Sequence, residues 1–137
     1  MTNRERARRL FQGAEWSYQD MQRALEQGIW NIAVRRAQET VELVLKGLLC
    51  LMGVDYPLVH DVGGLFVRVV RERGVALPEQ ALTRIEEISA ALARRRAPAF
   101  YFEEDISEDE AHRAAQDADT IWRWGQEWFN LLMGEQS

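Results

Sequence analysis

Residues 33–53 have the sequence AVRRAQETVELVLKGLLCLMG, and this stretch decides the fold. Its apolar residues recur every three or four positions, the spacing that places side chains on one face of an α-helix. A second set of apolar residues widens that face, so the helix predicted for Trp30–Met52 is covered almost all round. A helix of this kind lies at the centre of a bundle or at a contact between subunits.

The same spacing predicts four more helices around it, separated by glycine and proline. They are expected at Asn3–Glu26, from Asp61 to Gly74, from Pro78 to the arginines at 94–96, and from Ser107 to about Met133. No segment alternates with a period of two, so no strand is predicted. We therefore expect an all-α fold, an antiparallel four-helix up-and-down bundle with an additional short helix, in a single domain over residues 1–137.

Composition points to a soluble protein of the cytoplasm. The net charge of -5 argues against a surface that is wholly a nucleic-acid footprint. The single cysteine, Cys50, lies in the apolar run GLLCLMGV, which predicts a buried thiol and excludes an intramolecular disulfide. No uncharged apolar stretch reaches the roughly 20 residues that span a bilayer, so no membrane contact is predicted.

The motifs of metal sites and nucleophilic enzymes are missing. The two histidines, His60 and His112, do not complete a Glu-x-x-His element, and one cysteine cannot form a zinc site. The glycines at 63–64 lack the pattern of a phosphate-binding loop. We expect no metal and no cofactor, and we interpret His60 and Asp61 as a helix-start feature in which the carboxylate faces the positive end of the helix dipole.

Three local patterns have structural interpretations. A polar stripe on the central helix is interpreted as a solvent-exposed face in which one i,i+4 pair contributes about 0.3 kcal/mol; it consists of Arg35, Glu39, Glu42 and Lys46. The sequence SEDE predicts a capping box between Ser107 and Glu110. The aromatic residues of the last helix fill the core or form a homodimer seam; they are Trp122, Trp124, Trp128 and Phe129.

The stretch ARRRAPAFYFEED, residues 93–105, allows two interpretations. Arginine guanidinium groups match the geometry of phosphate, and a neighbouring aromatic ring offers a base a stacking surface. Cations at a helix C-terminus also complement the helix dipole without any ligand. The residue pattern alone leaves both a binding loop and a charged helix end open.

The order of these elements resembles the HEPN family of small helical domains. AVRRAQETVELVLKGLLCLMG is similar to that family's central helix, HDVGGL to the start of its third helix, and RRRAPAFYFEEDISEDEAHRAAQDADTI to its last loop and helix. The resemblance implies a homodimer and, in one branch, a toxin–antitoxin pair with a minimal nucleotidyltransferase. Active members are metal-independent ribonucleases with an Arg-x4–6-His motif, and some carry a tyrosine two residues later that the partner adenylylates.

This chain departs from that motif. After four intervening residues, the positions that follow the three arginines are Ala99, Phe100 and Tyr101, and no histidine stands within the family's spacing. With Arg94 as the motif arginine, Tyr101 stands where the modified tyrosine would be. The candidate site residues are therefore Arg94, Arg95 and Arg96 for phosphate or RNA, and Tyr101 for modification or stacking, while no catalytic residue is assigned.

Three hypotheses follow for function. The first is a non-catalytic HEPN module that binds a nucleotide or RNA and a nucleotidyltransferase partner. The alternative is a ribonuclease toxin with a degenerate motif, in which Tyr101 or His112 supplies the proton, so whether the chain is an enzyme stays open. The third is a helical homodimer of unrelated function. In each case we expect a dimer that brings two copies of the arginine loop together.

Overall fold

The computed structural model describes residues 1–135 and consists of five α-helices. Their bounds are α1 Asn3–Gln27, α2 Trp30–Leu51, α3 Gly63–Glu72, α4 Glu79–Phe100 and α5 Glu108–Glu135. Within the described residues no strand occurs, which confirms the all-α prediction. The predicted domain of residues 1–137 includes two residues, 136 and 137, that lie outside this part of the chain.

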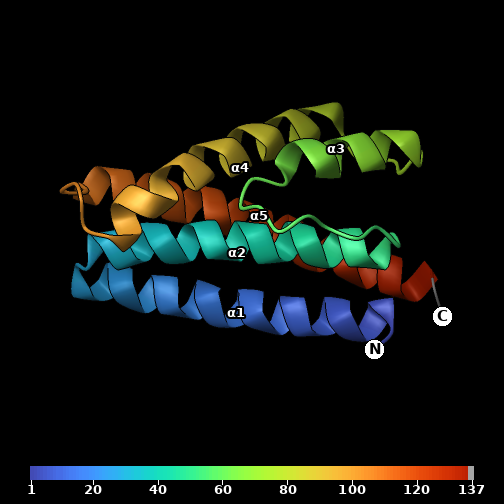
Figure 1. Ribbon diagram of the computed structural model, residues 1–137, viewed down its shortest axis with the longest axis horizontal. Helices are drawn as coiled ribbons and strands as arrows, with labels where there is room; N and C mark the ends of the chain where they lie inside the picture. Colours follow the sequence, from blue (N-terminus) through green and yellow to red (C-terminus); the bar gives the residue numbers. More distant parts are fainter. Residues whose placement is uncertain (136–137) are drawn as a thin grey trace.

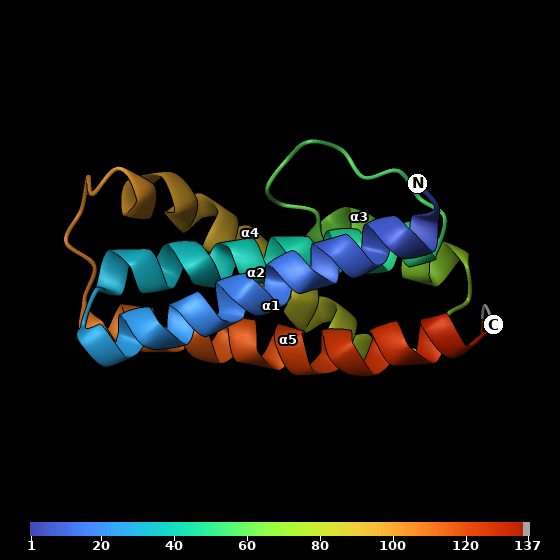
Figure 2. The ribbon, with the colours of Figure 1, turned by 90° about the horizontal axis from the view of Figure 1, so that it is seen from below.

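The four long helices form the predicted up-and-down bundle. Figure 1 shows α1, α2, α4 and α5 alternating in direction, with the short α3 beside the first half of α4. The turn between α1 and α2 and the loop between α4 and α5 lie at the same end of the molecule, as both views show (Figure 2). Residues distant in sequence therefore meet at that end.

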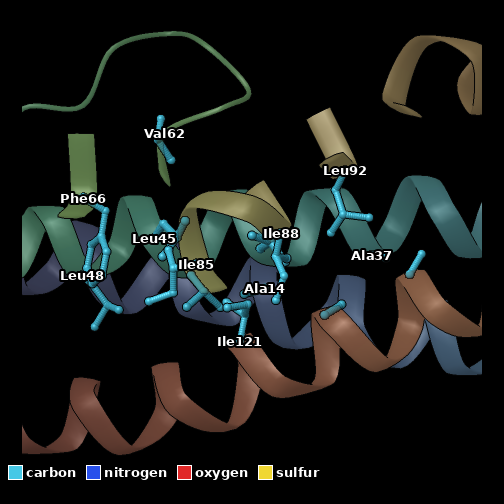
Figure 3. Packing of buried hydrophobic residues seen from close by; sticks show 14 of the residues in the cluster. Ala14, Ala37, Leu45, Leu48, Val62, Phe66, Ile85, Ile88, Leu92 and Ile121 are labelled. Atoms are coloured by element: carbon cyan, nitrogen blue, oxygen red, sulfur yellow. The ribbon is translucent and has the colours of Figure 1, made fainter. Parts of the chain in front are cut away.

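Helix α2 is the centre of the bundle, as its sequence predicts. The core forms around its side chains Leu45 and Leu48, which pack in one cluster with side chains from the other helices, among them Ile85 of α4 and Ile121 of α5 (Figure 3). These four side chains are at most 1% exposed. The thiol of Cys50 is buried, as predicted, and burial raises its pKa.

The aromatic residues of α5 fill space inside the chain. Trp122 packs edge-on against Tyr18, with ring centroids 5.4 Å apart, and Trp128 stacks on Phe66 at 6.3 Å. Of the two interpretations left open by the sequence, core filling accounts for these two rings.

Close approach of α5 to α2 requires a glycine. A Cβ atom added at Gly125 would lie 2.3 Å from Cγ1 of Val44, which is too close for two carbon atoms that are not bonded to each other. Val44 is itself fully buried, and its β-branched side chain has one preferred rotamer in a helix. The helix interface therefore depends on the missing side chain.

Helix α4 extends further than expected, because it continues through Pro98 to Phe100. Proline removes one backbone donor, yet the backbone around it stays helical: the amide of Tyr101 donates to the carbonyl of Ala97 at 3.0 Å. The methyl group of Ala99 is fully buried and holds this last turn against the bundle. Within the segment 93–105, the helix thus continues past its predicted end at the arginines to residue 100, and a loop follows.

Other helix starts differ by one or two residues from prediction. Pro78 precedes the first residue of α4, and α3 begins at Gly63, after Asp61. The Asp61 carboxylate accepts from the amide of Gly63 at 3.4 Å, so its assignment to the helix start is confirmed. At α5, the Ser107 hydroxyl accepts from the amide of Glu110 at 3.1 Å, which confirms one half of the predicted capping box.

Candidate functional site

The polar stripe on α2 is not a solvent-exposed face, contrary to its sequence interpretation. The connection between α2 and α3 turns back along α2 (Figure 1), and the Tyr56 ring in it lies 5.2 Å from Nζ of Lys46. The Lys46 side chain is only 8% exposed and that of Glu42 15%. The Glu42–Lys46 part of the stripe, which helical periodicity places on an outer face, is therefore covered by a loop.

Glu42 is the hub of this covered region. One carboxylate oxygen accepts from Nζ of Lys46 at 2.7 Å, and the other accepts from Nε2 of Gln38 at 2.8 Å and contacts Nδ1 of His60 at 2.8 Å. Burial alone would raise the pKa of the Glu42 carboxyl, but the hydrogen bonds from these three side chains outweigh it and hold that pKa below its usual value. Glu42 is therefore ionised at neutral pH.

His60 connects this buried carboxylate to the arginine stretch. Its Nδ1 faces Glu42, and its Nε2 lies 3.2 Å from Nε of Arg96. Because the guanidinium Nε–H can only donate, Nε2 is the acceptor, and the ring proton sits on Nδ1 and is donated to Glu42. The imidazole is thus fixed in orientation and tautomer while its side chain stays 54% exposed.

The three arginines of the stretch have three different environments. Arg95 donates to Glu104 at 3.0 Å and lies 2.7 Å from Glu110, and the hydrogen bond to Glu104 contributes most to raising its pKa. Arg94 is exposed to solvent. Arg96 contacts His60, and within residues 1–135 it forms no ion pair with a carboxylate. The candidate phosphate-binding residues therefore do not act as one group.

Hydrogen bonds from Asn31 of α2 hold the loop after α4 in place. Nδ2 of Asn31 lies 3.2 Å from the carbonyl of Glu104 and 3.5 Å from that of Ala99. Together with the contacts of Arg95 to the loop and to α5, these bonds fix the end of α4 relative to the bundle. The end of α4 is therefore held by contacts to both α2 and α5.

Arg96, His60 and the aromatic residues of the stretch line a common hollow of about 380 Å³, which we call the arginine–histidine pocket. Its polar and aromatic lining residues are Arg35, His60, Arg96, Phe100 and Tyr101. The Arg35 guanidinium carbon lies 3.8 Å from the centroid of the Phe100 ring, and Tyr101 meets that ring edge-on at 4.7 Å. Two cations, one imidazole and an aromatic wall are the groups that recognise a phosphate attached to a planar base.

The structure brings only part of the predicted site together. Arg96 and Tyr101 line the pocket, whereas Arg94 and Arg95 do not. His112, a proton donor considered from sequence, lies instead beside Glu108 at 3.7 Å and Trp30 at 5.7 Å. His60 was missed, because the signal HDVGGL was assigned to a helix start and its two polar partners are 18 and 36 positions away.

Two absences concern the described residues. Among residues 1–135, no group of three or more His, Cys, Asp or Glu side chains is arranged to hold a metal ion. In the same part of the chain, no helix is both long and apolar enough to cross a bilayer.

Comparison with known proteins identifies the family. No curated protein matches the chain. A solved structure described as that of an archaeal HEPN homologue has the same fold, with a TM-score of 0.68 at 20% sequence identity over 90% of this chain and 97% of that one. The HEPN domain profile matches residues 7–128, which include all of α2, α3 and α4, most of α1 and α5, and all lining residues of the pocket. The chain therefore belongs to the HEPN domain family.

Proposed function

We propose that this chain binds a nucleotide or RNA through a phosphate held in the arginine–histidine pocket. The observation that carries the proposal is the state of Arg96: its guanidinium faces an open hollow, and in the described residues its partner is a neutral imidazole instead of a carboxylate. An arginine in that setting retains donors for an anion, and the planar fork suits phosphate oxygens. Arg35 also lines the pocket. Its Nε forms an ion pair with Glu39 at 3.2 Å, and its guanidinium adds positive charge to the pocket wall.

The aromatic side of the pocket supports a ligand that carries a base. Tyr101 is 66% exposed, so its ring is free to stack on a base, whereas one face of Phe100 is taken by Arg35. The volume of about 380 Å³ is in the range of small-molecule sites, which begin at roughly 300 Å³. A single nucleotide unit fits these dimensions, with its phosphate toward Arg96.

The test is binding of a fluorescein-labelled single-stranded RNA, followed by anisotropy. Loss of a charge-assisted hydrogen bond costs about 1.5–3 kcal/mol, so we expect Arg96→Ala to weaken binding at least tenfold. Arg94→Ala is the matched control, because this neighbour has the same charge but lies outside the pocket; it should change affinity less than about threefold at 0.15 M salt. Equal losses for both variants would show that general charge, and not the pocket, binds RNA.

We also propose that the chain acts as a homodimer in the cytoplasm, in a toxin–antitoxin-type pair with a nucleotidyltransferase. Family membership supports this, as does the exposure of Tyr101, which leaves its hydroxyl open to a modifying partner. Light scattering at micromolar concentration tests the dimer, and purification of the tagged chain from its native host tests the partner. A monomer, or recovery without a nucleotidyltransferase and no such gene nearby, would refute the respective part. If alanine at all three arginines changed only solubility, a helical dimer of unrelated function would be left.

A further inference from the structure

His60 has the arrangement of a general base. A histidine acts as a base when one ring nitrogen is held by an acceptor and the other presents its lone pair to the reacting group. Here Nδ1–H is held by the ionised Glu42 at 2.8 Å, and Nε2 lies 3.2 Å from Nε of Arg96, which lines the same arginine–histidine pocket as His60. Glu42 is in turn fixed by Lys46 and Gln38, so the direction of the imidazole is set by a buried network.

The lone pair of Nε2 is covered in this structure. The Nε–H of Arg96 donates to it at 3.2 Å, so no substrate hydroxyl can use the base while that contact lasts. A phosphate in the pocket is a stronger acceptor for the guanidinium than a neutral imidazole, because its oxygens are charged. We therefore expect a bound phosphate to draw Arg96 away from Nε2 and to uncover the base when substrate is present.

We propose that His60 is the proton acceptor for cleavage of an RNA phosphodiester in this pocket. The proposal rests on the phosphate-binding function proposed above and adds chemistry to it. It also assigns the proton transfer to the connection between α2 and α3, in place of the last-loop histidine that the sequence lacks. His60 and Arg96 are 36 positions apart in the chain and in hydrogen-bond contact in space.

The reaction is a transesterification. Nε2 of His60 takes the proton of the ribose 2′-hydroxyl, the 2′-oxygen forms a bond to phosphorus, and the bond from phosphorus to the 5′-oxygen breaks. The 5′-oxygen leaves with the electron pair and takes a proton from water, and the hydroxide so formed takes the proton back from His60. Arg96 stabilises the charge that develops on the phosphoryl oxygens. The products are a 2′,3′-cyclic phosphate and a 5′-hydroxyl end.

Glu42 is a positioning residue in this scheme, since it touches His60 and not the substrate. Its negative charge also favours the protonated imidazole that forms during the reaction. The positive charges of Arg96, Arg35 and Lys46 on the surrounding helices have the opposite effect. Glu42→Gln keeps an oxygen acceptor for Nδ1–H and removes the charge. We expect a lower rate and an acidic limb of the pH–rate profile displaced to lower pH; a purely structural role would lower the rate without moving the limb.

The experiment compares cleavage and binding with the same protein. Cleavage is measured in EDTA on a short labelled single-stranded RNA that contains all four bases, and binding on the same sequence with 2′-O-methyl groups, which cannot react. The variants are His60→Gln and, as a control purified identically, His112→Gln, since that histidine lies outside the pocket. We expect the wild-type chain and His112→Gln to leave 2′,3′-cyclic phosphate ends. His60→Gln should cleave at least 100-fold more slowly, the usual share of a general base, with affinity for the methylated RNA within about threefold.

Each other result is decisive. Binding of methylated RNA without cleavage of RNA by the wild type would overturn the assignment of His60 and leave the proposed binding function standing. Equal cleavage by His60→Gln, or loss of cleavage in His112→Gln, would also overturn it. Absence of binding by the wild type would refute the proposed function and, with it, this inference.

Discussion

Replacing Glu42 by leucine tests whether the polar stripe of α2 is buried. The substitution keeps a side chain of similar size and leaves the Lys46 ammonium, in a side chain only 8% exposed, without its carboxylate at 2.7 Å. Breaking a buried ion pair on one side costs about 3–5 kcal/mol, and the remaining exposure of both side chains favours the lower end, about 3 kcal/mol. The same pair on a solvent-exposed face would contribute only about 0.3 kcal/mol. The two descriptions differ tenfold.

Urea unfolding followed by circular dichroism measures this difference. With a slope of about 2 kcal/mol per molar urea, a loss of 3 kcal/mol lowers the midpoint by about 1.5 M. The matched variant is Glu42→Leu combined with Lys46→Met, which removes both charges; we expect it to recover at least half of the loss and to remain about 1 kcal/mol below the wild type, because the buried Gln38 amide still lacks its acceptor. A single variant that loses less than about 0.5 kcal/mol would show that the pair is solvated and that the loop does not cover it.

Three further outcomes are expected from the same unfolding assay. The folded-state pKa of Glu42 is lowered, so its contribution to stability is complete above the unfolded carboxyl pKa of about 4.3 and is lost as the pH falls through the lower folded pKa. The free energy of unfolding of the double variant should therefore fall less steeply with acid than that of the wild type. The same pH dependence in both proteins would contradict this. Gly125→Ala should lose about 1–3 kcal/mol by overpacking against Val44, whereas Gly64→Ala, whose added methyl meets nothing within 4 Å, should be neutral or gain up to about 1 kcal/mol; a neutral Gly125→Ala would mean that the helices separate freely. Ser107→Ala should lose about 1 kcal/mol with the cap of α5, and Ser107→Asp, which keeps an acceptor, should not.

The fold could be predicted from sequence because its signals are local. Periodic apolar residues, glycines at the ends of helices and the near-continuous apolar surface of 33–53 are all visible within one element. The end of α4 could not be predicted in this way. A proline normally ends a helix, but here burial of Ala99 and the bonds from Asn31 hold the last turn, and both depend on residues of other elements.

The site was predicted only in part for the same reason. The arginines and Tyr101 stand together in the sequence, so they could be identified as candidate site residues. Which guanidinium lines the pocket, which is ion-paired and which is exposed depends on the direction of each arginine side chain on α4. His60 gave a sequence signal that was assigned to the neighbouring helix start. Its role depends on Glu42 and Arg96, and no local pattern connects these three residues.

The order of the residues in the pocket has a consequence for finding related sites. His60 precedes Arg96 by 36 positions, so a search for arginine followed closely by histidine discards this chain, although the two side chains are 3.2 Å apart. A search by interatomic distance would retain it: an imidazole nitrogen near a guanidinium, with a buried carboxylate behind the ring. Chains without the arginine–histidine spacing should therefore be compared by geometry as well as by motif.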